Sequence, residues 1–349
     1  MTHPLVIIPL LVLLIRLALW LNKRRQATAV HSAPAAGLVP RTELVEAGSE
    51  PADPAARAAL DAAKSGNWRP AAAYLSDGNG DWSTRYARMN PFSHLAATDD
   101  IWLRQWRKEQ PDSPEAAQVH TDALVRRAWE IRTGRYASEV TREQAMGFHQ
   151  VLQQAAEVSQ EAIRLAPAGD PNAWVMQLSV ALGQGWSHER YRALWAEIVA
   201  REPHHFGAHS GALQYWCQKW RGSDELMHAF ADDAIAGAPA GSLLTVLKLR
   251  AYWEQVLRDN SGASLYRSAE FTAALDAALA DLAAADPAHP GVVAASGWIA
   301  HGLIETARPA QALDLFRRMG REIAGPWTYY ENQAAVFDTA RIKAARAAA

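Results

Sequence analysis

Nearly every segment after Asp53 has the composition of an α-helix, and no other feature constrains the fold as strongly. Ala, Leu, Arg, Glu and Gln dominate these segments, and no long alternating run of β-branched residues appears among them. Helix-start signals agree, because Asp53-Pro54 and Ser113-Pro114 place a capping side chain before a proline that fits the first turn. The sequence therefore predicts an all-α fold.

Turn and cap residues set the expected helix boundaries. Thr141 and Gln144 form a capping-box pattern at the start of one long helix. Residues 78–97 are expected to be irregular, because Asn90-Pro91 interrupts a helix and glycines follow Asp77. The expected helices cover residues 54–65, 69–77, 98–110, 114–132, 142–165, 171–182, 187–201, 205–219, 223–236, 240–258, 264–285, 290–306, 309–321 and 327–346.

The spacing of prolines in the second half of the chain indicates a repeat. Pro167, Pro203 and Pro239 are 36 residues apart, and each closes a helical stretch. Pro287 follows after 48 residues, and the excess matches an insertion near Asp259. Each interval is then expected to hold one pair of helices.

A family resemblance accompanies this spacing. Residues 162–167, followed by Trp174, resemble the end of one tetratricopeptide-type repeat and the early tryptophan of the next, and Asp286-Pro287 before Gly297-Trp298 is similar. The resemblance covers about residues 140–322, with a stretched period and few of the signature glycines. It implies an α-solenoid of antiparallel helix hairpins that binds a peptide or protein, and it assigns no binding residue. Residues 215–223 also resemble an uncharacterised bacterial family of helical domains, which implies no activity.

A stack of hairpins buries the apolar face of each hairpin against its neighbours, and large tryptophan side chains can fill the space between them. Trp102 and Trp106 lie four residues apart, as do Trp216 and Trp220, so each pair projects from one helical face. We expect these pairs to pack in the core. The alternative is an aromatic binding platform.

The N-terminus predicts a membrane anchor. Residues 4–21 form an apolar run that is about 27 Å long as a helix, which is enough to cross a bilayer, and Arg16 can reach the head groups. Residues 23–25 are Lys-Arg-Arg, and the positive-inside rule places them and the body behind them in the cytoplasm. We therefore expect a single-pass anchor at 1–25, a flexible Ala/Pro-rich linker at 26–52 and an α-helical repeat domain at 53–349, with the lipid bilayer as partner of residues 4–21.

A cleaved signal peptide is the competing interpretation. Ala27-Thr28-Ala29 has the small-x-small form of a cleavage site. The charge order opposes cleavage, because residues 1–3 carry no Lys or Arg and the basic cluster follows the apolar run. Cleavage would export the body instead of tethering it.

Composition excludes several classes of protein. The chain has 35 Lys and Arg against 37 Asp and Glu, so it offers no global attraction to nucleic acid, and no nucleic-acid partner is expected. Its single cysteine, Cys217, rules out an internal disulfide and a four-cysteine zinc site. In a packed helix this thiol is expected to be inert.

The histidines at residues 204–209 are the nearest approach to a catalytic or metal motif. His205 and His209 are spaced i,i+4, as two metal ligands on one helical face require, yet no HExxH motif or third ligand accompanies them. Capping or surface roles are the favoured interpretation. The alternative is an enzyme of unrecognised class with its site in an inter-helix groove near His204 to His209.

Two further patterns give weaker indications of a binding site. Asp77-x-Asn79-x-Asp81 resembles the start of a calcium loop, but Trp82 stands where glycine is required. A basic patch at Arg126, Arg127, Arg132 and Arg135 is the first place to expect lipid contact if the body lies near the inner leaflet.

No catalytic, cofactor-binding or metal-binding residue is assigned from the sequence, and no cofactor is expected. A membrane-tethered helical-repeat protein acting as a protein–protein interaction scaffold is the function hypothesis, which rests on fold analogy.

Overall fold

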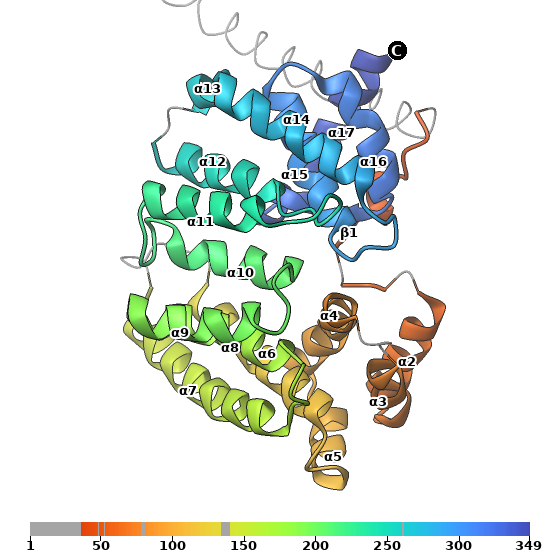
Figure 1. The fold of residues 1–349 in the computed structure, drawn as a ribbon. Helices are drawn as coiled ribbons and strands as arrows, with labels where there is room; N and C mark the ends of the chain where they lie inside the picture. Colours follow the sequence, from red (N-terminus) through yellow and green to blue (C-terminus); the bar gives the residue numbers. More distant parts are fainter. Residues whose placement is uncertain (1–35, 48, 52, 78–80, 134–139, 260–261) are drawn as a thin grey trace, which may run out of the picture. The chain divides into compact units, whose positions relative to one another are not determined.

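The computed structural model describes residues 36–47, 49–51, 53–77, 81–133, 140–259 and 262–349. Within these residues the chain is all-α, with only two short strands (Figure 1). The predicted anchor at residues 4–21 lies outside the described residues. No helix among those described has the length and apolarity needed to cross a membrane.

The chain divides into two compact units, one made of residues 46–295 and the other of residues up to 45 together with 296–349. The first unit contains α2 (Pro54–Lys64), α3 (Arg69–Ser76), α4 (Trp82–Thr98), α5 (Ile101–Glu109), α6 (Pro114–Arg132), α7 (Arg142–Leu165), α8 (Asn172–Gly183), α9 (His188–Val199), α10 (Phe206–Trp216), α11 (Asp224–Ala236), α12 (Val246–Asp259), α13 (Gly262–Leu265) and α14 (Ala269–Ala284).

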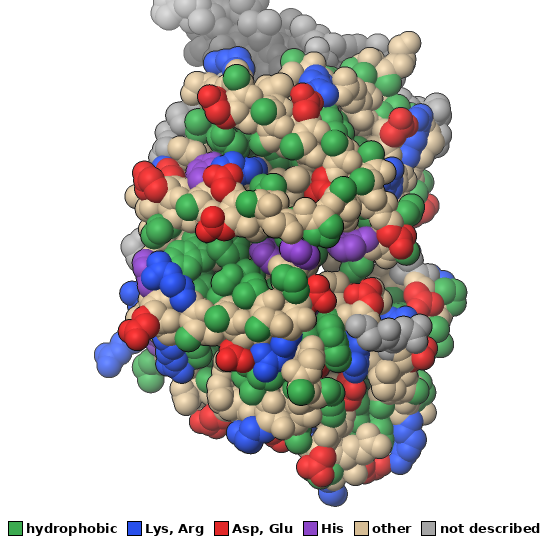
Figure 2. All heavy atoms as spheres, viewed as in Figure 1, with side chains coloured by type: hydrophobic (Ala, Val, Ile, Leu, Met, Phe, Trp, Pro, Cys, Tyr) green, Lys and Arg blue, Asp and Glu red, His purple; other side chains and the backbone are tan. Residues whose placement is uncertain are grey.

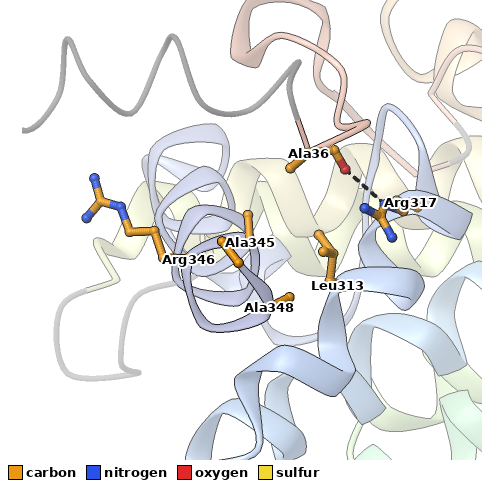
Figure 3. Close-up of a pocket in the computed structure, with 7 residues that line it drawn as sticks. Ala36, Leu313, Arg317, Ala345, Arg346 and Ala348 are labelled. Carbon is orange, nitrogen blue, oxygen red and sulfur yellow. Dashed lines mark hydrogen bonds between the residues drawn. The ribbon is translucent and has the colours of Figure 1, made fainter.

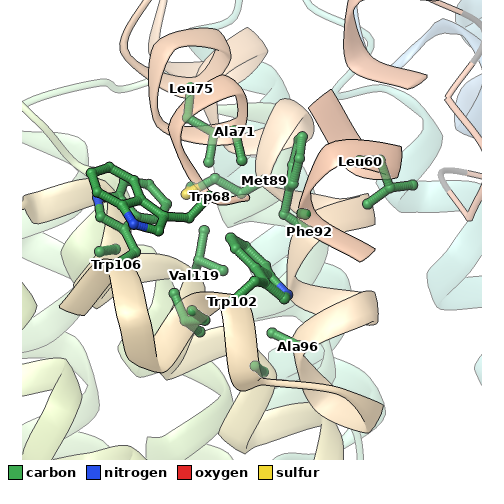
Figure 4. Packing of buried hydrophobic residues seen from close by; sticks show 14 of the residues in the cluster. Leu60, Trp68, Ala71, Leu75, Met89, Phe92, Ala96, Trp102, Trp106 and Val119 are labelled. Carbon is green, nitrogen blue, oxygen red and sulfur yellow. The ribbon is translucent and has the colours of Figure 1, made fainter. Parts of the chain in front are cut away.

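Helices α2 to α6 enclose an aromatic core (Figure 4). Trp102 and Trp106 of α5 are each 1% exposed, and the ring of Trp106 stacks on that of Trp68 at a centroid distance of 5.8 Å. Phe92 of α4 contacts Trp102 edge to face at 6.2 Å. The Trp102/Trp106 pair is therefore core, as its spacing predicted.

From α6 to α14 most packing joins helices that are adjacent or next but one in the chain. The pairs α6/α7, α7/α8, α8/α9, α8/α10, α10/α11, α10/α12, α11/α12 and α12/α14 are in contact. Figure 1 shows α10, α11 and α12 side by side in chain order. The interval from Pro167 to Pro203 holds α8 and α9, and the interval to Pro239 holds α10 and α11. The predicted pair of helices per interval is confirmed, and α13 is the insertion near Asp259.

The second unit is built around α17 (Gln333–Ala348). The 3-10 helix η1 (Arg41–Glu43), strand β2 (Glu322–Ile323), η3 (Pro309–Ala312), η4 (Gly325–Tyr329) and α16 (Leu313–Met319) all contact α17. Strand β1 (Val45–Glu46) pairs with β2, and α15 (Val292–Glu305) contains the residue at which the two units are divided. Leu38 is buried, so residues 36–47 of the segment expected to be a flexible linker are folded instead.

The predicted irregular region is wrong over most of its length, because α4 occupies Trp82–Thr98 with Pro91 inside it. The carboxylate of Asp81 caps the helix by accepting from the backbone N–H groups of Ser83 and Thr84 at 3.1 and 3.2 Å. Phe92 and Met89 are buried on either side of the proline. Tertiary burial therefore offsets the hydrogen bond that proline removes.

Four expected helices differ in extent. The helix predicted at 309–321 is η3 followed by α16, and the one predicted at 327–346 begins only at Gln333, after η4. The helix predicted at 240–258 begins only at Val246, because the chain before it turns with positive φ at Gly241 (87°) and Leu243 (65°). The helix predicted at 264–285 is split into α13 and α14, and Ser268 caps α14 by accepting from the N–H of Phe271 at 3.0 Å. The capping box of Thr141 and Gln144 is confirmed at the start of α7.

Candidate functional site

Helices α9, α10 and α11 each begin at a side-chain cap. Ser187 caps α9 and Ser223 caps α11, each accepting from a backbone N–H three residues on. His205 caps α10 with its ring, since Nδ1 accepts from the N–H of Ala208 at 3.1 Å. Such caps satisfy N–H groups that the helix itself leaves unpaired, and they fix where each helix starts.

A cluster of aromatic rings bridges α9 and α11 over α10. The ring of Trp195 in α9 lies 5.3 Å from that of Phe230 in α11, and both contact His209 of α10, at 4.8 and 6.0 Å. Trp216, at the end of α10, stacks on Phe230 at 6.5 Å. We call Trp195, His209, Trp216 and Phe230 the aromatic recess.

The aromatic recess is open on one side. Its floor is buried, with His209 3% and Trp216 7% exposed, whereas Trp195 and Phe230 are only half-buried. Figure 2 shows an uncovered hydrophobic area at the level of α10, between α9 and α11. Partly exposed aromatic rings that converge from two helices are suited to receive an apolar side chain.

Two arginines lie at one end of the aromatic recess. The guanidinium carbon of Arg192 lies 5.3 Å from the centre of the Trp216 ring, and Arg221 donates to the carbonyl of Gly185. Burial raises the pKa of Tyr215, and the positive charges of Arg221 and Arg192 oppose this rise, so both lie near one hydroxyl. Neither arginine forms an ion pair with a carboxylate in the described part of the chain.

Two stacked tyrosines, Tyr191 and Tyr215, pack against the Trp216 ring of the aromatic recess. The rings of Tyr191 and Tyr215 are parallel at 3.6 Å, and the hydroxyl of Tyr215 donates to the carbonyl of Trp186 at 2.7 Å. From the far side, buried Glu254 of α12 accepts from Lys219 at 2.7 Å and from Gln214 at 2.7 Å. These contacts hold the end of α10 in place, and with it Trp216.

The two histidines singled out by spacing have structural roles. His205 is fully buried, and besides its cap its Nε2 lies 3.0 Å from Oδ1 of Asn172, so both ring nitrogens are engaged. Nδ1 of His209 bonds the carbonyl of His205 at 3.1 Å. Burial lowers the pKa of each to about 4, which keeps both rings neutral at pH 7. The predicted capping role is confirmed for His205, whereas His209 is buried in the aromatic recess.

The remaining sequence candidates are dispersed. Asp81 is the cap of α4, and residues 78–80 of the calcium-like pattern lie outside the described residues. Cys217 is 2% exposed, and burial raises the pKa of its thiol to about 12. Within the described residues no group of three or more His, Cys, Asp or Glu side chains is arranged to hold a metal ion.

The described arginines of the basic patch predicted at residues 126–135 contact other parts of the protein. Arg126 bonds Asp122 at 2.9 Å and also bonds Asn90, while Arg127 donates to the carbonyl of Ala97 at 3.1 Å. The guanidinium of Arg132 lies over Trp129 and Trp220. Arg135 lies outside the described residues. Three of the four arginines thus bind the protein itself.

Sequence reasoning named Trp216 as core and did not single out Trp195, Phe230 or Arg192. Trp195 and Phe230 are 35 residues apart, and no local pattern joins them. A comparison of the chain with models of protein families, with curated proteins and with solved structures finds no significant match.

Proposed function

We propose that this chain is a membrane-tethered helical-repeat scaffold that binds a segment of a partner protein in the aromatic recess. The observation that carries the proposal is the convergence of Trp195 and Phe230, from two helices, over the buried floor of His209 and Trp216. The partner would contribute an extended segment whose apolar side chain covers the half-buried rings of Trp195 and Phe230.

The packing order supports a tetratricopeptide-like α-solenoid as the fold of this scaffold. Helices α8, α10 and α12 contact one another in turn, and each is followed by a partner, α9, α11 or α14, that packs on it. Such an arrangement extends a core in one direction and leaves grooves between repeated elements. Between α9 and α11 the half-buried rings of Trp195 and Phe230 meet over α10.

The charge beside the aromatic recess indicates the chemistry of the partner. Arg192 and Arg221 are exposed and lack a carboxylate partner in the described part of the chain, so an acidic side chain of the partner can pair with either. The bound segment therefore carries an apolar residue for the recess and an aspartate or glutamate near it. This combination adds specificity to the apolar contact.

The proposal of a membrane tether is based on the apolar run at residues 4–21 and on the basic residues that follow it. We propose a cytoplasmic location for the body. Alkaline phosphatase fused after residue 349 is expected to be inactive, because the enzyme works only outside the cytoplasm, and a green fluorescent protein fused there is expected to fluoresce. Active phosphatase with a shortened chain would support cleavage and export instead.

Photo-crosslinking in the native cell tests the binding proposal. Benzoylphenylalanine at Ala196, one turn after Arg192 and next to Trp195, is expected to give a discrete adduct of higher mass. Ala277, an exposed alanine of α14, is the matched position away from the recess. The adduct at residue 196 is expected to disappear when Trp195→Ala and Phe230→Ala are introduced together, and mass spectrometry identifies the captured segment.

Two results would contradict the proposal. Identical adducts at residues 196 and 277 would show non-selective capture. An adduct at residue 196 that persists in the double variant, with circular dichroism unchanged, would show that the aromatic recess does not hold the partner.

A further inference from the structure

His209, in the floor of the aromatic recess, uses only one of its two ring nitrogens within the fold. Its Nδ1 lies 3.1 Å from the backbone carbonyl oxygen of His205, one turn earlier in the chain. A carbonyl oxygen only accepts hydrogen bonds, so Nδ1 carries the proton and donates it. Burial lowers the pKa of the ring to about 4, so the ring is neutral at pH 7 and Nε2 keeps its lone pair as an acceptor.

This Nε2 has no partner of its own. No hydrogen bond joins it to another group in the described part of the chain, and, unlike Nδ1 of His204, it is not among the unpartnered atoms that the fold seals from solvent. The rings of Trp195 and Phe230 contact the imidazole at centroid distances of 4.8 and 6.0 Å. The aromatic recess therefore presents a hydrogen-bond acceptor as well as apolar rings to a side chain that enters it.

The hollow in the second unit offers no comparable group. It measures about 350 Å³ and lies between α16 and the last turns of α17, with an apolar wall formed by Leu313, Ala345 and Ala348 (Figure 3). Arg317 at its edge donates to the carbonyl of Ala36 at 2.9 Å and to the carboxylate of Asp314 at 2.7 Å, and Arg346 points away from it. The arginine beside this hollow is thus already paired, whereas Nε2 of His209 is not.

An unpaired acceptor in the recess discriminates between side chains that cover it. A purely apolar side chain removes Nε2 from water and supplies no donor, and a buried acceptor without a partner is costly. A side chain with an N–H or O–H group that reaches Nε2 avoids this cost. Sites built around such a polar group reject analogues that lack the matching donor.

We infer that the aromatic recess receives a tryptophan or tyrosine of the partner segment, and that His209 selects it by accepting a hydrogen bond from its N–H or O–H group. This inference rests on the proposed function and narrows it. The ring of the incoming residue packs against Trp195 and Phe230, as aromatic pairs do, while its donor meets the imidazole. His209 then determines specificity, and the acidic residue of the segment pairs with the neighbouring arginines.

Ligand-observed NMR on the full chain in lipid nanodiscs, with empty discs as baseline, tests the inference with two matched pairs of probes. N-acetyl-L-tryptophan is compared with N-acetyl-3-benzothienyl-L-alanine, in which sulfur replaces the indole N–H, and N-acetyl-L-tyrosine with N-acetyl-L-phenylalanine. Each probe carries a carboxylate for the arginines. In at least one pair the member with the donor is expected to bind about three- to tenfold more tightly, which is the effect of one hydrogen bond.

Substitutions of His209 assign this preference to its ring. His209→Leu removes the acceptor and is expected to make the affinities within each pair equal. His209→Gln is expected to keep part of the preference, because its amide oxygen also accepts. The matched control is His228→Leu, which removes a half-buried imidazole of α11 that contacts Tyr252 and lies 3.3 Å from the amide oxygen of Gln255, and it is expected to keep the full preference. Circular dichroism checks that each variant folds, and the comparison in the wild type needs no variant.

The outcomes separate this inference from the proposed function. Equal affinities within both pairs, with binding lost in Trp195→Ala/Phe230→Ala, would overturn the role of His209 and leave the recess as the binding site. A donor preference that persists in folded His209→Leu would also overturn it. Binding that survives the loss of both Trp195 and Phe230, or no binding of any probe, would contradict the recess itself, and the inference fails with it.

Discussion

The indole of Trp195 and the phenyl ring of Phe230 meet at a centroid distance of 5.3 Å, although they belong to α9 and α11, which do not pack closely backbone to backbone. Two half-buried rings thus bridge a gap between helices. Apolar rings that stay partly exposed contribute less to folding stability than fully buried rings do. Exposed apolar surface of this kind is typical of a site that another molecule covers.

Gly222 is required by the turn that positions Trp216. A Cβ atom at this residue would lie 1.6 Å from the backbone oxygen of Trp216, whereas a Cβ at Gly237 would meet nothing within 4 Å. Gly222→Ala is therefore expected to destabilise the protein by about 1–3 kcal/mol through overpacking. Gly237→Ala is the matched control and is expected to change stability by less than about 1 kcal/mol. Denaturant unfolding followed by circular dichroism measures both, and equal midpoints would contradict the turn geometry.

Stability is expected to fall as the pH is lowered from about 6.5 to about 4. The folded chain holds His205 and His209 neutral, because burial lowers each pKa from 6.5 to about 4. Between pH 6.5 and 4 these two histidines are protonated in the unfolded chain but neutral in the folded chain. Unfolding therefore becomes more favourable as the pH falls. Each histidine contributes roughly 3 kcal/mol at most across the window.

Urea midpoints at pH 7, 5.5 and 4.5 measure this dependence. His209→Gln is expected to reduce the slope with pH, and His94→Gln, which removes an exposed imidazole from α4, is the matched control. An unchanged slope in His209→Gln would contradict burial of this ring.

Cys217 is expected to be unreactive in the folded chain. Burial raises the pKa of its thiol to about 12, so the reactive thiolate is scarce at pH 8, and the side chain is 2% exposed. Reaction with a chromogenic disulfide reagent is expected to be slow for the native protein and complete in 6 M guanidinium chloride. Rapid reaction of the native thiol would contradict the packing of the end of α10.

Local signals predicted much of this fold. The bounds of α6 and α7 agree with those expected, because a capping serine followed by proline and a capping box are chemistry that neighbouring residues decide. Pro91 shows where such reasoning stops. A proline inside a helix is unfavourable locally, and only the burial of Phe92 and Met89 against distant helices keeps α4 continuous.

The candidate site was less predictable. The i,i+4 spacing of His205 and His209 is real, but the use of each ring depends on partners elsewhere, such as Asn172 for His205. The aromatic recess joins side chains from three helices, and half-exposed Trp195 has no sequence feature that separates it from a core tryptophan. The contact between Trp195 and Phe230, which are 35 residues apart, can be recognised only once the fold is known.

Binding of the captured segment, as a synthetic peptide, tests the central claim most directly by isothermal titration calorimetry. Trp195→Ala and Phe230→Ala are each expected to raise Kd at least about tenfold, as for aromatic residues at the centre of an interface. Trp174, another half-buried tryptophan, has the guanidinium of Arg201 at 3.7 Å from its ring and lies outside the recess, so Trp174→Ala is the control and is expected to leave Kd within about twofold. Wild-type affinity in folded Trp195→Ala would contradict the account.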